Sequence, residues 1–134
     1  MQTSTKQPTT PLNRFQTAPL LFTLPFPPSS NQRLMPVGRR LILSPGSRNY
    51  LKEAETSIRQ QQVNLKLEGE LYVEMAFVRP DKRLRDLDDY VKLPWDACTY
   101  AGVWLDDSQV VAYKVCWYGE IGKPGGVMML VKQV

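Results

Sequence analysis

The sequence contains no histidine among its 134 residues. This absence excludes a Ser-His-Asp triad, a Cys-His catalytic pair, a histidine general base and a histidine-ligated zinc ion. Any hydrolytic chemistry must therefore use carboxylates, lysine or a metal ion that carboxylates bind. Ligand sets made only of oxygen atoms favour Mg²⁺ or Mn²⁺ over zinc.

Cysteine is almost as scarce, with only Cys98 and Cys116 in the whole chain. Their separation matches neither a metal-binding nor a redox motif of the C-x-x-C type. Both lie in apolar stretches, so we expect two buried free thiols in a protein from a reducing compartment.

Long apolar runs are also missing. No stretch approaches the roughly 20 apolar residues that a transmembrane helix needs. Residues 1–10 lack the basic start and the apolar segment of a secretory signal peptide. We therefore expect no association with a membrane.

The composition that remains is typical of a globular domain, with 43% hydrophobic and 22% charged residues. A net charge of +4 and a pI of about 9.2 permit a polyanionic partner without requiring one. Residues 1–18 are rich in Thr, Gln and Pro and are expected to form a flexible tail. Residues 19–134 are expected to fold as one domain.

Alternating and continuous apolar patterns predict the strands. In residues 69–80, Leu71, Val73, Met75 and Phe77 share one face, and a proline follows. The proline-rich segment 25–33 is expected to be an ordered loop or extended chain rather than a helix. The remaining predicted strands are a short one ending at Pro25, a strand or hairpin arm at residues 38–44, and longer strands at residues 110–118 and 127–133.

Two helices are predicted from apolar stripes at a spacing of three and four residues. The first has Ser47 as its N-cap and runs to about Gln61. The second runs from near Asp88 to Tyr100, with Asp86 or Asp88 as the cap and a kink at Pro94. The fold class is therefore α/β, a single domain with a mixed sheet and two main helices.

Aromatic side chains fall mostly within the periodic apolar runs. Trp95, Trp104, Trp117 and Tyr113 are expected to pack in the core rather than to stack on bases. Phe26 lies beside prolines in a loop, which leaves it more open to a binding role.

Acidic residues gather at two predicted element boundaries. One cluster lies in "RLRDLDDYVK", residues 83–92, and the other is formed by Asp106 and Asp107. We expect a β-α-β unit to bring both boundaries to one edge of the sheet. Carboxylates that meet there repel each other unless a cation holds them, and a divalent ion would supply that charge.

Basic residues accompany the first cluster. Lys92 lies four residues after Asp88, one helical turn away, where it could hold that carboxylate or stabilise charge on a phosphate. The arginines and the lysine at residues 79–85 could bind a phosphodiester backbone. The pattern suits metal-assisted phosphodiester hydrolysis. Solvated helix caps and i,i+4 ion pairs are the alternative interpretation of the same residues.

The stretch "RDLDDYVKLPWDACTYAGVWLDDSQVV", residues 85–111, closely resembles the signature of the RusA family of Holliday junction resolvases. The family pattern is R-D-L-D-N, a lysine four residues past the second aspartate, D-A-L, an A-G-x-x segment and D-D-x-Q-V. "LPFPPSSNQR", residues 24–33, resembles the opening strand and P-P-S-x-N loop of the family. The resemblance extends over residues 21–131.

The resemblance implies a RusA-like fold and an Mg²⁺-dependent homodimeric endonuclease, with Mn²⁺ able to substitute, acting on four-way DNA junctions. It further implies no nucleotide cofactor, a bacterial or phage gene, and action in the cytoplasm of a bacterial host. The catalytic residues carry over as Asp86, Asp88, Lys92 and Asp107, the three aspartates being the metal ligands. Asp106 and Asp89 are expected to support them. The expected DNA contacts are Asn31, Arg33, Arg79, Lys82, Arg83 and Arg85.

Three departures from the family pattern keep alternatives open. Asp89 stands where the family has asparagine, Pro94 replaces a residue that favours a helix, and residues 1–17 have no counterpart. The alternatives are a branched-DNA-binding protein that is weak or inactive in catalysis, and a nuclease for forks and flaps.

Overall fold

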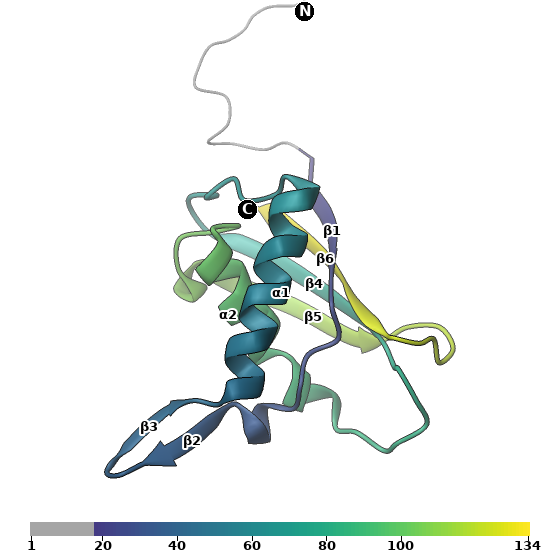
Figure 1. The fold of residues 1–134 in the computed structure, drawn as a ribbon. Helices are drawn as coiled ribbons and strands as arrows, with labels where there is room; N and C mark the ends of the chain where they lie inside the picture. The colour runs from purple at the N-terminus through teal and green to yellow at the C-terminus, as the bar shows by residue number, and fades with distance from the viewer. Residues whose placement is uncertain (1–17) are drawn as a thin grey trace, which may run out of the picture.

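Six strands and two helices arise from residues 18–134, the part of the chain that the computed structural model describes (Figure 1). The predicted flexible tail lies outside these residues except for Ala18. The elements in chain order are β1 (Leu20–Leu24), β2 (Leu34–Val37), β3 (Arg40–Leu43), α1 (Pro45–Gln61), β4 (Leu71–Val78), α2 (Lys92–Ala101), β5 (Val110–Trp117) and β6 (Gly126–Gln133).

A four-stranded sheet in the order β1-β6-β4-β5 forms the centre of the domain. β4 pairs in parallel with β5 and antiparallel with β6, and β6 pairs antiparallel with β1. Figure 1 shows α1 and α2 lying side by side across one face of this sheet. The prediction of an α/β domain with a mixed sheet and two helices is confirmed.

The core lies between that face of the sheet and the two helices. The predicted inner face of β4 is confirmed, because Leu71, Val73, Met75 and Phe77 are all at most 1% exposed. Each such side chain contributes about 1.5–3 kcal/mol through burial. β4 therefore anchors the segments that follow it along the chain.

A separate β2–β3 hairpin projects from the start of α1 (Figure 1). The sequence predicted only its second arm, because β2 is short, mostly exposed and contains Pro36. Before it, residues Ser30–Gln32 form one 3₁₀ turn, η2, in which the Ser29 hydroxyl accepts a hydrogen bond from Asn31 N. The segment 25–33 is thus an ordered loop with one short 3₁₀ turn and no α-helix, as predicted.

The N-cap of α1 is Ser44 and not the predicted Ser47. The Ser44 hydroxyl accepts a hydrogen bond from Ser47 N, and Pro45 occupies the first helical position, which suits its fixed φ. Ser47 is fully buried in the first turn, where its hydroxyl donates to the carbonyl of Arg33. The start of α1 thereby fixes the backbone of the loop that carries Arg33.

Helix α2 begins at Lys92, four residues later than predicted. A 3₁₀ turn, η3 (Leu87–Tyr90), precedes it, and neither Asp86 nor Asp88 caps a helix through its side chain. Pro94 lies in the first turn of α2, where its missing N–H removes no intrahelical hydrogen bond. Pro94 therefore gives α2 no reason to kink, contrary to the prediction. Gly102, at φ +84°, ends the helix as predicted.

The cysteines and aromatics match the predictions only in part. Cys98 is buried, whereas Cys116 is half-buried, and both thiols are free. Trp104 is fully buried, but Tyr113 is 55% exposed because it lies on the edge strand β5. Phe26 is half-buried and packs against the core side chains of Tyr90 and Phe77. Within residues 18–134, no helix is long and apolar enough to cross a membrane.

Gly125→Ala is expected to lower the free energy of unfolding by about 1–3 kcal/mol. Gly125 has φ +79°, and an added Cβ would lie 2.8 Å from the carbonyl oxygen of Val78. Gly119→Ala is the matched control, because Gly119 also has a positive φ but open space around it. Urea denaturation should show the larger loss for Gly125→Ala. Equal losses of stability in the two variants would mean that the close approach of the new Cβ to the Val78 carbonyl contributes nothing to the loss in Gly125→Ala.

Candidate active site

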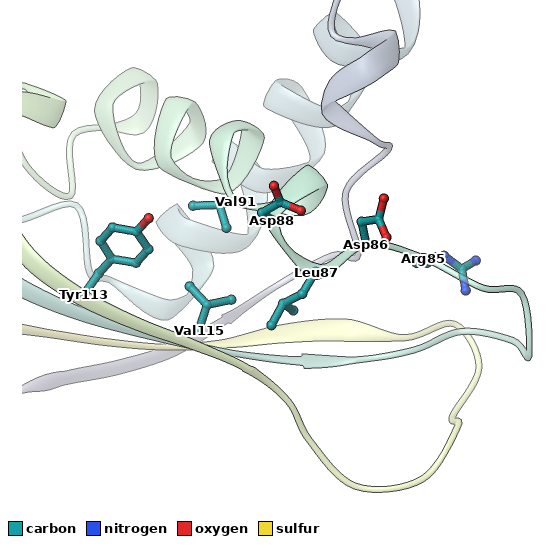
Figure 2. A pocket seen from close by; sticks show the side chains of 7 residues that line it. All are labelled: Arg85, Asp86, Leu87, Asp88, Val91, Tyr113 and Val115. Carbon is teal, nitrogen blue, oxygen red and sulfur yellow. The ribbon is translucent and has the colours of Figure 1, made fainter.

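The first acidic cluster lies beside the middle of β5 rather than at the end of a strand. After β4, residues 79–86 lead back to η3, and a hollow of about 460 Å³ opens between η3 and β5 (Figure 2). Figure 2 shows Leu87 turned toward the sheet, and Asp86 and Asp88 both on the opposite side of the chain, apart from each other. The hollow is lined by Arg85, Asp86, Leu87, Asp88, Val91, Tyr113 and Val115.

Asp86 and Asp88 are both exposed. Neither carboxylate has a hydrogen bond or an ion pair with another of the described side chains. Hard, anionic oxygen donors that are free of protein partners are suited to a divalent cation. The chemistry of these two residues therefore fits the predicted metal ligands.

The second acidic cluster is held by a turn at the start of β5. In the 3₁₀ turn η4 (Asp107–Gln109), the Asp106 carboxylate accepts from Ser108 N. Hydrogen bonding by Ser108, first through its side chain and then through its backbone N–H, lowers the pKa of Asp106. The Gln109 amide donates to the carbonyls of Leu67 and Gly69, 2.9 Å away in each case. Asp106 thus shapes the turn, and Gln109 ties the turn to the chain that leads into β4.

Asp107 is surrounded by three donors. Its Oδ2 accepts from Lys92 Nζ at 2.7 Å, and its Oδ1 accepts from the Thr99 hydroxyl and from Trp104 Nε1, the latter at 3.2 Å. Burial alone would raise the pKa of Asp107, but the hydrogen bonds from Lys92 and Thr99 outweigh it and lower the pKa. Asp107 is therefore a fixed carboxylate that is fully ionised at neutral pH.

Lys92 forms ion pairs with Asp107 and Asp96, and not with Asp88 as predicted. Its Nζ lies 2.7 Å from Asp107 Oδ2 and 3.1 Å from Asp96 Oδ1. Burial lowers the pKa of Lys92, but the hydrogen bonds to Asp107 and Asp96 reverse this and raise it. The predicted pairing with Asp88 was wrong, because Asp88 lies in η3, outside the helix that starts at Lys92.

Both acidic clusters lie along β5, the edge strand of the sheet, as predicted, the first beside its middle and the second just before its start. Their carboxylates, however, do not meet. Among residues 18–134, no three acidic or cysteine side chains gather closely enough to hold one metal ion. Asp107 lines a different hollow, of about 510 Å³, together with Arg33, Asp96 and Asp106. The roles of Asp86, Asp88 and Asp107 as metal ligands stay predictions.

Asp89 is half-buried in η3, and its backbone N–H donates to the carbonyl of Asp86. Nothing in the structure explains why its side chain is acidic.

The predicted DNA-contacting residues divide by exposure. The Arg85 side chain is only 8% exposed, pairs with Asp81 at 2.9 Å and lies over the Phe26 ring. Arg79 lies over the Trp117 ring, 5.0 Å from its centroid. These two side chains support the fold of the loop, which leaves Arg85 little surface for a phosphate.

The other predicted contacts are more accessible. Arg83 is 81% exposed although it pairs with Asp81, and Lys82 and Asn31 are exposed as well. Arg33 is 25% exposed, and its Nε donates to Asp96 Oδ2 at 2.8 Å. Arg33 therefore faces the neighbourhood of Lys92 and Asp107 rather than open solvent.

Sequence reasoning missed Asp96, Thr99 and the polar role of Trp104. Asp96 follows Lys92 by four residues, so the i,i+4 rule that suggested Asp88 applied to it equally. Thr99 and Trp104 contact each other as well, with Trp104 Nε1 donating to Thr99 Oγ1 at 2.7 Å. The position of Trp104 in an apolar run did not indicate that its indole N–H donates a hydrogen bond to Asp107.

Comparisons with known proteins point to one family. The family model described as endodeoxyribonuclease RusA matches residues 25–126, which include both acidic clusters and Lys92. The chain is 37% identical over 93 residues to proteins named crossover junction endodeoxyribonuclease RusA from Escherichia coli (strain K12), Shigella sonnei (strain Ss046) and Enterobacteria phage 82. Each match covers 69% of this chain and 78% of the relative.

Proposed function

The chain belongs to the RusA family of endodeoxyribonucleases, and from this premise we propose that it is a metal-dependent nuclease that resolves four-way DNA junctions. The proposed reaction is hydrolysis of phosphodiester bonds by paired nicks, in the cytoplasm of a bacterial or phage-infected cell. The observation that carries the proposal is the family match across residues 25–126, which includes Asp86, Asp88, Lys92 and Asp107.

The proposed division of roles follows from the contacts at each side chain. Asp86 and Asp88, exposed and without partners among the described side chains, would hold Mg²⁺ or Mn²⁺. Asp107, fixed by Lys92, Thr99 and Trp104, is the proposed third ligand, which requires the two acidic clusters to move closer together when the ion binds. A bound divalent ion activates water and offsets negative charge on the phosphate.

Lys92 is the proposed cationic partner of the scissile phosphate. Its raised pKa keeps Nζ protonated at neutral pH, so it can donate to a phosphate oxygen or to the leaving oxygen. The Lys92 side chain is 44% exposed, so a substrate can reach it without unfolding the site. Nζ is held by hydrogen bonds to Asp96 and Asp107, which limit the freedom it must lose when the substrate arrives.

Exposed cations near the η3 hollow are the proposed phosphate contacts. Lys82 and Arg83 belong to the loop that leads to Asp86, so a DNA strand along this loop would pass the acidic residues. We propose that two copies of the chain act together, because two sites related by symmetry are needed for paired nicks.

The proposed function is tested by cleavage of a synthetic four-way junction with mapped nicks. The wild-type protein with Mg²⁺ should give symmetric paired nicks, whereas Asp88→Asn should bind the junction without cutting it. Linear duplex, a fork and a flap of matching sequence are the controls for substrate structure. Faster cleavage of the fork or the flap would assign the protein to those structures. Salt-sensitive junction binding without cleavage in Mg²⁺ or Mn²⁺ would indicate instead that the protein binds branched DNA but does not cut it.

A further inference from the structure

Asp96 joins two cations that come from distant parts of the chain. Its Oδ2 accepts from Arg33 Nε at 2.8 Å, and its Oδ1 lies 3.1 Å from Lys92 Nζ. The Asp96 side chain is 17% exposed, so both contacts are partly shielded from water. The pair with Arg33 spans 63 residues, whereas the pair with Lys92 lies within one turn of α2.

The backbone of Arg33 is fixed independently of this contact. Its carbonyl accepts from Ser44 N at 2.9 Å and from the Ser47 hydroxyl at 2.9 Å, and its N–H donates to Ser30 O at 3.1 Å. The loop is therefore anchored to the start of α1 whether or not Asp96 is charged. Loss of the Asp96 charge would release the Arg33 guanidinium without releasing the loop.

Lys92, in contrast, would keep only one anchor. Without the Asp96 carboxylate, its Nζ retains the hydrogen bond to Asp107 Oδ2 but can rotate about that contact. A lysine side chain has several rotatable bonds, and two fixed acceptors restrict it far more than one does. The position of Nζ relative to Asp107 therefore depends on Asp96.

We propose that Asp96 is a positioning residue with two opposite effects, and this inference rests on the proposed function. Asp96 holds Lys92 beside Asp107 in the geometry that cleavage uses. It also withholds the Arg33 guanidinium from the DNA backbone. Loss of its charge is expected to slow cleavage and, at the same time, to tighten DNA binding.

The central test is Asp96→Asn, which keeps the size of the side chain and removes its charge. At saturating enzyme, the single-turnover rate of junction cleavage should fall by about 10- to 100-fold, as for other residues that orient a catalytic group. Affinity for the junction without metal should rise. The slope of log affinity against log salt should steepen by about 1, because one more cation contacts phosphate.

Glu55→Gln is the matched control for charge. Glu55 forms an i,i+4 ion pair with Arg59 on α1, so this variant also removes one negative charge and one arginine partner. It should leave cleavage unchanged and should not steepen the salt slope as Asp96→Asn does. Asp96→Glu, which restores the charge, should recover part of the cleavage rate.

The double variant Arg33→Gln with Asp96→Asn separates the two effects. The gain in affinity should disappear because the released cation is gone, whereas the loss in cleavage rate should stay. A folding defect would instead weaken binding and cleavage together in every Asp96 variant. Equal losses in both, or an affinity gain as large in Glu55→Gln, would overturn the inference.

A spectroscopic measurement keeps this inference distinct from the proposed function. The Arg33 Nε–Hε signal in a ¹H–¹⁵N NMR spectrum should exchange slowly with water in the wild-type protein and rapidly in Asp96→Asn. A wild-type protein that cuts no junction would reject the proposed function. A slowly exchanging signal in Asp96→Asn would reject the restraint on Arg33, whether or not the wild-type protein cuts DNA.

Discussion

Asp107→Asn is expected to abolish junction cleavage while the junction still binds. The substitution removes the negative charge that faces Lys92 Nζ at 2.7 Å and that the proposed metal ion requires. The single-turnover rate should fall by roughly 10³-fold or more, the scale seen when a group that stabilises transition-state charge is removed. Rates at saturating enzyme with Mg²⁺, and gel-shift affinities without metal, measure the two properties separately.

The geometry around Asp107 explains why an amide cannot replace the carboxylate. Three donors point at its two oxygens: Lys92 at Oδ2, and Thr99 and Trp104 at Oδ1. An asparagine offers one oxygen and one NH₂ group, so at least one of these donors would face another donor. The side chain would turn, and Lys92 would lose an anchor.

Asp106→Asn is the matched control for Asp107→Asn. Asp106 is the adjacent acid, exposed, and its carboxylate accepts from Ser108 N in the turn η4. Asparagine is as good a cap as aspartate, so cleavage should change by no more than a few-fold. If the Asp107→Asn protein cut at the wild-type rate, Asp107 would not be part of the active site. Equal losses in the two variants would show that the turn, rather than the carboxylate, is what matters.

The parts of the fold that could be predicted from the sequence are those that a regular period controls. The alternation of Leu71, Val73, Met75 and Phe77 has only one arrangement that buries all four, so β4 and its inner face followed directly. The apolar stripe of α1 is similarly unambiguous, and its residues Tyr50, Ala54 and Ile58 are buried. Local pattern and tertiary burial agree in these elements.

The start of α2 was harder to predict because two competing signals lie in the same residues. The acids at positions 86–89 are typical of a helix N-terminus, but the chain first forms the 3₁₀ turn η3. Lys92 has an aspartate four residues before it and another four residues after it. Only the point at which the helix begins decides between them, and sequence spacing does not give that point.

The distance between the two acidic clusters depends on the path of the chain between β4 and β5. The expected β-α-β unit is present, with β4 parallel to β5. The first cluster follows η3 back to the middle of β5, whereas the second lies just before the start of β5. The residues that surround Asp107 come from α2 and from the chain after it, so tertiary packing rather than local pattern assembles this half of the site.

Trp104→Ala is expected to lower the free energy of unfolding by about 3–5 kcal/mol, as for other fully buried tryptophans. Trp104 is 0% exposed, and its ring meets that of Trp95 edge to face. Its removal leaves a large cavity between α2 and the sheet, and the Thr99 hydroxyl and Asp107 lose a donor. Urea denaturation followed by circular dichroism measures the loss.

Trp104→Phe separates packing from the hydrogen bond. Phenylalanine fills most of the space but cannot donate to Thr99 Oγ1 or Asp107 Oδ1, so the stability loss should be smaller, about 1–3 kcal/mol. Cleavage should nevertheless fall, because Asp107 and Thr99 would then be held by one contact fewer. A Trp104→Phe protein with wild-type cleavage would show that the indole only fills space. A protein that stays folded but cuts slowly would show that the core and the carboxylate are coupled through this N–H.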